Sequence, residues 1–141
     1  MRRGPATQPR EVGDGGVATD RVFFGIGSLS AFIAVALGAF AAHGLRSRLT
    51  PDMLATFETG VRYHMFHALA LFAVAWECTR GPGNGALVAG WLFVAGTLIF
   101  SGSLYLLAIT GWRWFGAITP LGGLCFLAGW AVLGWRAFST G

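Results

Sequence analysis

Long uncharged runs alternate with short polar segments along the 141 residues of the chain. Charged side chains are missing from residues 22–42, 86–109 and 114–135, and most positions in these runs are apolar. A helix of about 20 residues, rising about 1.5 Å per residue, crosses the roughly 30 Å hydrocarbon layer of a bilayer. The pattern therefore predicts three transmembrane helices over these ranges.

A fourth span is predicted over residues 61–78, where the uncharged stretch is shorter. It runs from Tyr63 to Trp76 and contains two histidines. Arg62 and Glu77 flank it, and long charged side chains at such positions can extend a span by reaching outward to the interface. Neighbouring spans can supply hydrogen-bond partners for the histidines.

The segment between the first two spans predicts a short amphipathic helix over residues 51–59. Thr50 suits the N-cap and Pro51 the first helical position, because proline there has no N–H left without a partner. The apolar side chains that share one face are Met53, Leu54 and Phe57. A helix with such a face lies in the plane of the membrane interface. A solvated loop helix is the alternative interpretation.

Residues near the start of the last span shape its helix. Pro120 lies inside it, and a proline at such a position kinks a helix or frees a backbone carbonyl. Glycines follow at Gly122, Gly123 and Gly129. Small residues let membrane helices approach closely, so we expect a kinked helix in close contact with a neighbour.

Residues 1–20 mix charges with Gly and Pro and have no apolar periodicity, which predicts a disordered tail ahead of a membrane domain over residues 21–141. Ala39-Phe40-Ala41 has the form of a signal peptidase site, but the apolar run before it is longer than a usual signal core. We therefore expect this first span to stay in the protein. The expected fold class is an all-α membrane protein, a four-transmembrane-helix bundle with a short amphipathic surface helix between helices 1 and 2.

Composition excludes a soluble globular protein. Charged residues make up 11% of the chain, against about 25% in a typical soluble domain, hydrophobic residues make up 55%, and the mean hydropathy is +0.62. The ten basic residues are all arginines and are dispersed, so no nucleic-acid footprint is predicted. Cys78 and Cys125 have no zinc-site spacing, so no metal site is predicted. The predicted partner is the lipid bilayer, and a homo-oligomer remains open.

Arginine placement predicts the orientation. With four spans, the two termini and the middle turn share one side of the membrane, and six of the ten arginines fall there. Cytoplasmic loops carry the excess of basic residues, so both termini are expected in the cytoplasm. The arginines on that side are Arg2, Arg3, Arg10, Arg21, Arg80 and Arg136, and those opposite are Arg46, Arg48, Arg62 and Arg113.

Polar residues from all four spans are expected in the same half of the bilayer. His64 and His67 share a helix face by their i,i+3 spacing. If the second helix begins near Val61, His67 lies about 9 Å below its end. Ser103 lies near the third-span members of this group. The predicted cluster comprises His43, Tyr63, His64, His67, Ser101, Tyr105 and Thr119.

Three interpretations of this cluster remain. Interhelical hydrogen bonds that hold the bundle together are the preferred one. A small-solute or proton-coupled transporter is the alternative, because ionisable groups inside a membrane often mark a pathway. Haem ligation by His43 with His64 or His67, or quinone binding, is the second alternative. Catalytic templates such as G-x-S-x-G or HExxH do not match, so the sequence predicts no catalytic residue, no cofactor and no enzyme activity.

Four strings carry a family resemblance: ALGAFAAHGL at 36–45, TGVRYHMFHALAL at 59–71, GTLIFSGSLY at 96–105 and TPLGGLCFLAGW at 119–130. In this order and spacing, over residues 22–136, they resemble the YgdD/YwdK family of small bacterial membrane proteins. The resemblance implies four spans, a bacterial inner-membrane location and an unknown molecular function, structural or accessory in our interpretation. The family usually has Gln where this chain has His64, so a role of His64 alone would not be general to the family.

Overall fold

The structure, a computed structural model, describes residues 14–80 and 84–139, and every element in them is helical. The elements are α1 (Asp14–Phe40), η1 (Ala41–Leu45), α2 (Pro51–Thr79), α3 (Gly85–Gly96), η2 (Thr97–Ser101), α4 (Gly102–Thr110) and α5 (Trp114–Ser139). Both η elements are π-helical turns. α3, η2 and α4 follow one another without a break and are called the third rod. The all-α prediction is confirmed.

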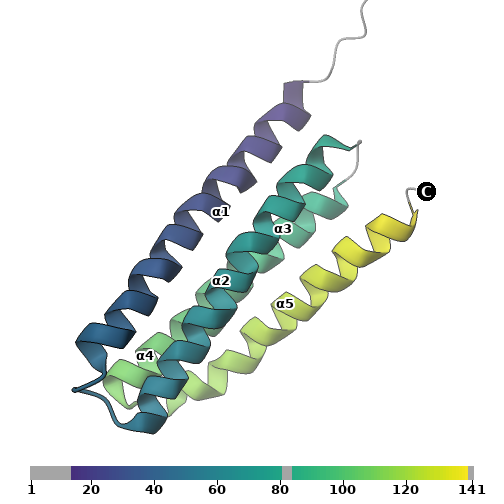
Figure 1. Cartoon of the computed structure of the whole chain (residues 1–141). Coiled ribbons are helices and arrows are strands. Elements are labelled where there is room, and N and C mark those ends of the chain that lie inside the picture. Colours follow the sequence, from purple (N-terminus) through teal and green to yellow (C-terminus); the bar gives the residue numbers. More distant parts are fainter. Residues whose placement is uncertain (1–13, 81–83, 140–141) are drawn as a thin grey trace, which may run out of the picture.

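The four rods form an antiparallel bundle (Figure 1). α1 packs mainly on α2, α5 packs mainly on the third rod, and α2 packs on the third rod to join the two pairs. In Figure 1, α1 and α5 lie on opposite sides of α2. The connections at 46–50 and 111–113 lie at the same end of the bundle, and Gly111 closes the third rod with a φ of 73°.

Three stretches of helix in the described chain are long and apolar enough to cross a membrane. They are Thr19–Leu45, Gly85–Thr110 and Trp114–Ser139. Each is about 40 Å long at the rise of an α-helix, which exceeds the hydrocarbon thickness. Their outward faces carry exposed large apolar side chains such as Phe32, Leu98 and Leu127, as expected of surfaces in contact with lipid.

The first helix begins earlier than predicted. α1 starts at Asp14, so residues 14–20 are helical, whereas the sequence assigned them to the disordered tail. The rest of that predicted tail, residues 1–13, lies outside the described residues. The other predicted spans, 86–109 and 114–135, lie within the third rod and α5.

The surface helix predicted over residues 51–59 is not a separate element. Its start is as expected, because the Thr50 hydroxyl accepts a 3.3 Å hydrogen bond from the Met53 backbone N–H and Pro51 follows. The helix then continues to Thr79 as the 29-residue α2. Phe57 is only 1% exposed and packs in a small core with Leu45. Of the apolar face that suggested the membrane surface, Phe57 is buried against η1 and α4 instead.

The outward face of α2 changes character along its length. Glu58 and Arg62 are exposed in its first half, and Phe66 and Leu69 are exposed in its second half. This half-polar face explains why α2 is not among the apolar spans, although it is about 43 Å long. Its place in the bundle depends on the three apolar rods around it.

Glycines and phenylalanines interlock α5 with the third rod. A Cβ atom at Gly129 would lie 2.6 Å from the Phe93 ring, and one at Gly96 would lie 2.5 Å from the Phe126 ring. A Cβ at Gly122 would overlap the backbone nitrogen of Phe100. Each helix therefore offers a notch that a ring of the other helix fills. The close contact predicted from Gly122 and Gly129 is confirmed.

Gly122→Ala should destabilise the bundle by about 1 to 3 kcal/mol, because the added methyl group meets backbone that can move only with its helix. Gly134→Ala is the matched control, since a Cβ there meets nothing within 4 Å. Thermal unfolding of the purified protein in detergent, followed by circular dichroism, measures both. Equal stability of the two variants would contradict the interlocked packing.

Candidate functional site

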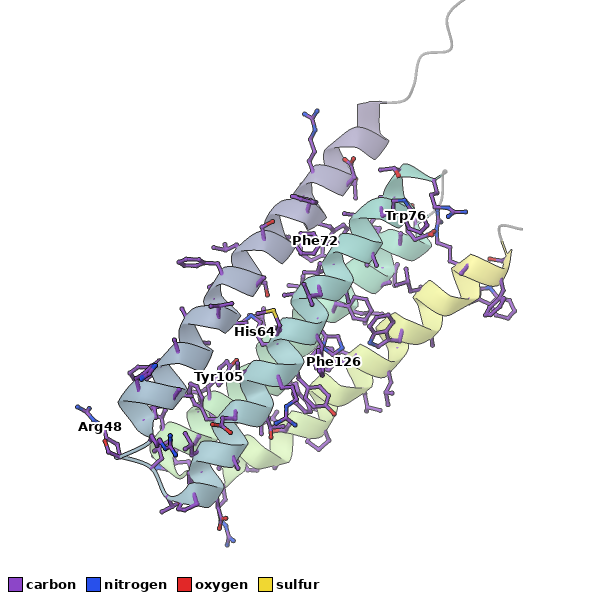
Figure 2. The ribbon with its side chains drawn as sticks, viewed as in Figure 1. Arg48, His64, Phe72, Trp76, Tyr105 and Phe126 are labelled. Atoms are coloured by element: carbon purple, nitrogen blue, oxygen red, sulfur yellow. The ribbon has the colours of Figure 1, made fainter. Side chains whose placement is uncertain are left out.

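A hydroxyl, an imidazole and a second hydroxyl form a chain across three helices. His64 of α2 is buried, and its Nε2 lies 2.9 Å from the hydroxyl oxygen of Ser30 in α1. Its Nδ1 lies 3.1 Å from the hydroxyl oxygen of Tyr105 in α4. Figure 2 shows His64 and Tyr105 near the junction of α1 and α2. These three residues are called the His64 chain.

His64 lies near the middle of α2. His64 is about 20 Å along α2 from its first residue and about 22 Å from its last. The sequence placed the histidines close to a helix end, with His67 about 9 Å inside, because the helix was expected to begin near Val61. The helix begins at Pro51, so His67 lies about 24 Å inside.

His67 faces α5 and has both ring nitrogens engaged. Its Nδ1 lies 2.8 Å from the Tyr63 carbonyl oxygen, and the Trp130 indole N–H donates to its Nε2 at 3.3 Å. The imidazole stacks on the Phe126 ring with the ring centroids 3.4 Å apart. A carbonyl only accepts and an indole N–H only donates, so Nδ1 carries the hydrogen and Nε2 the lone pair. These two partners hold His67 in one neutral tautomer.

The two histidines do not form one cluster. Residues three apart on a helix point about 60° away from each other, and α2 lies between α1 on one side and α5 on the other (Figure 1). His64 contacts Ser30 and Tyr105, whereas His67 contacts Trp130. The expectation that both share one polar site is therefore wrong.

The other predicted cluster members are also dispersed. His43 is exposed in η1. The Tyr63 ring packs against Phe100, and its carbonyl oxygen accepts from His67. The Thr119 hydroxyl lies 2.7 Å from that of Ser103 and joins α5 to α4. Ser101 is 0% exposed, and its hydroxyl oxygen has no hydrogen-bond partner in the described chain.

Sequence reasoning missed Ser30 and Trp130. A serine in the middle of an apolar span was the available signal for Ser30, because a hydroxyl in hydrocarbon needs a partner. Trp130 lies well inside the last span, away from the ends where interface tryptophans gather. Its partner could not be inferred, because the sequence does not show which neighbouring helix His67 faces.

Two grooves open between the rods at the level of these groups. The α1 groove, of about 370 Å³, lies between α1 and the third rod and has Ser30, His64 and Tyr105 in its lining. The α5 groove, of about 860 Å³, lies between α2 and α5 and includes His67 and Trp130. Leucines at the edges of both grooves are exposed, so both open sideways toward lipid.

Haem ligation would compete with these hydrogen bonds. Both ring nitrogens of His64 and of His67 already have protein partners. The third candidate ligand, His43, is on the exposed surface of η1. Within the described residues, no group of three or more His, Cys, Asp or Glu side chains is arranged to hold a metal ion.

An ion pair joins α2 to α5 at the opposite end of the bundle from the 46–50 connection. The Nε of Arg136 lies 3.4 Å from a Glu77 carboxylate oxygen, and these side chains are only 9% and 13% exposed. Arg80 lies 3.7 Å from the same carboxylate, with its side chain 55% exposed and its guanidinium over the Trp76 ring. The sequence indicated Glu77 only as a flanking charge.

Arg136→Met should cost about 1 to 3 kcal/mol of stability, because it leaves the carboxylate of Glu77 half-paired in a poorly hydrated site. Arg80→Met removes the exposed partner of the same carboxylate and should cost less than about 1 kcal/mol. Unfolding midpoints in detergent compare the two. If Arg80→Met lost as much stability as Arg136→Met, the buried pair of Arg136 with Glu77 would not contribute more to stability than the exposed pair.

Comparison with known proteins adds a family and three relatives. Residues 37–123 match the sequence profile of a family described as "Protein of unknown function (DUF423)". The chain is 47% identical over 114 residues to the UPF0382 membrane protein YwdK of Bacillus subtilis, covering 80% of this chain and 93% of that protein. A UPF0382 membrane protein of Haemophilus influenzae is 45% identical over 114 residues, or 80% and 90% of the two chains.

The UPF0382 inner membrane protein YgdD of Escherichia coli is 38% identical over 115 residues, which cover 82% of this chain and 88% of that protein. No solved structure matches the chain.

Proposed function

The chain belongs to the DUF423 family of proteins of unknown function and is an integral membrane protein, and from this premise we propose that it is a structural or accessory component of the bacterial inner membrane, without enzyme activity. The observation that carries this proposal is the pairing of polar side chains across helices. His67 with Trp130, and Ser103 with Thr119, each join α5 to a neighbouring rod.

The state of His67 supports a structural role. A general base needs a ring nitrogen whose lone pair is accessible to a substrate. The lone pair of His67 is occupied by the Trp130 N–H, and its own N–H lies against a backbone carbonyl. Such a histidine fixes the distance between α2 and α5.

The sideways opening of both grooves favours this role over small-solute or proton-coupled transport. A transport path must connect the two faces of the membrane. The α1 groove is bordered instead by exposed Leu29 and Leu98, and its other walls are mostly apolar. Hydrocarbon chains of lipid therefore meet these grooves before water does.

Two serines two residues apart provide the test. Ser103→Ala should lower stability by about 0.6 to 2 kcal/mol, because it removes the hydroxyl that joins α4 to Thr119 of α5. Ser101→Ala should be neutral or stabilising, because that buried hydroxyl has no partner to lose. Thermal unfolding in detergent measures both variants. The structural proposal fails if Ser103→Ala unfolds like the wild type, or if proteoliposomes show a solute flux that His67→Ala abolishes.

For the orientation, we propose that both termini face the cytoplasm, on the arginine count of six against four. In a background with Cys78 and Cys125 replaced by serine, a membrane-impermeant maleimide should label Ser47→Cys from outside the inner membrane. It should reach Asn84→Cys only after the membrane is opened. The reverse labelling pattern would show the opposite orientation.

A further inference from the structure

The His64 chain contains one more hydrogen-bond donor than it uses. Ser30 and Tyr105 each have one hydroxyl hydrogen, and a neutral imidazole has one N–H. The two hydrogen bonds of the chain consume two of these three donors. One hydroxyl hydrogen therefore has no acceptor among the described residues, whichever tautomer His64 adopts.

The spare donor can lie at either end of the chain. When His64 donates from Nδ1 to Tyr105, the Ser30 hydroxyl donates to Nε2 and the hydroxyl hydrogen of Tyr105 is free. In the other tautomer both bonds reverse, and the hydroxyl hydrogen of Ser30 is free. His64 differs from His67 in this respect. The carbonyl and indole partners of His67 allow its two hydrogen bonds to run in only one direction.

The α1 groove gives a ligand access to this donor. Its lining contains Ser30, His64 and Tyr105 among apolar side chains, and its volume of about 370 Å³ lies within the usual range for small-molecule sites. The π-helical turn η2 and Gly102 form part of its wall. A Cβ at Gly102 would meet nothing within 4 Å, so the glycine leaves open space there.

Depth in the membrane limits what can accept this hydrogen bond. Ser30 lies about 16 Å from one end and about 22 Å from the other end of the apolar span Thr19–Leu45, whereas water and the ester groups of phospholipids lie at the interfaces. An acyl chain reaches this depth but has no acceptor. The acceptor must belong to a lipid-soluble molecule with a polar group that enters the bilayer interior.

We propose that the α1 groove binds the ring of a lipid-soluble quinone. A ring carbonyl oxygen accepts the spare hydrogen of Ser30 or Tyr105, and the apolar tail leaves past Leu29 and Leu98 into the lipid. A quinone combines a flat ring, a carbonyl acceptor and an apolar tail in one molecule. The proposal concerns binding alone and goes beyond the structural role, which rests on the contacts of α5.

The test uses the full chain in nanodiscs of phosphatidylethanolamine and phosphatidylglycerol. An azido-quinone photoprobe labels the protein, decylubiquinone competes for the site, and mass spectrometry maps the labelled peptides. Labelling is expected on α1 and α4 around the groove. Decylbenzene, which has the tail and a ring but no carbonyl, should compete about tenfold more weakly than decylubiquinone, as expected for the loss of one hydrogen bond.

Gly102→Leu fills the groove and should weaken decylubiquinone binding at least tenfold. Gly134→Leu is the matched control, because Gly134 also has open space around it but does not line the groove; its affinity should equal that of the wild type. Leu29→Trp, at the edge of the groove, gives a second blocked variant if Gly102→Leu does not fold. Unchanged affinity in a folded blocked variant, equal competition by decylbenzene, or labels only outside the groove would each overturn the proposal.

Discussion

A polar side chain buried in hydrocarbon is costly unless it finds a hydrogen-bond partner inside the protein, and this constraint shapes how the bundle is arranged. In the described residues Ser101 is the one buried side chain that lacks such a partner. α2 is the most polar of the four rods, because it has histidines in its middle and exposed charges in its first half. It is not apolar enough to cross a bilayer by composition alone. The neighbouring helices provide hydrogen-bond partners for its histidines, namely Ser30 from α1, Tyr105 from α4 and Trp130 from α5.

These hydrogen bonds require helices held at fixed distances, and the interlocking of rings with glycines supplies that frame. Phe93 fills the notch at Gly129, and Phe126 fills the notch at Gly96. The Phe126 ring also stacks on His67, so one side chain contacts both the third rod and α2. The same packing that brings α5 close to the third rod therefore orients the imidazole toward Trp130. Stability and the geometry of the polar groups are not independent in this bundle.

The sequence predicted the helices well where charged residues mark their ends. It predicted them poorly where contacts between helices determine the structure. Uncharged runs located the third rod and α5, and Thr50 with Pro51 located the start of α2. The continuity of α2 was missed because an apolar face at Phe57 looks the same whether it meets lipid or protein. The separation of His64 from His67 was missed because spacing gives the angle between two residues but not which neighbour lies at each angle. The π-helical turns have no signal in the residue pattern.

The contrast between the two histidines shows how identical side chains acquire different capabilities. A carbonyl and an indole N–H have fixed polarity, so His67 has one protonation pattern and is limited to holding α2 against α5. Two hydroxyls can each donate or accept, so the His64 chain can reverse its polarity without moving an atom other than hydrogen. Chemistry that involves a molecule from the lipid is therefore expected on the side of α2 that faces α1. The α5 side, although its groove is larger, has no equivalent freedom at its histidine.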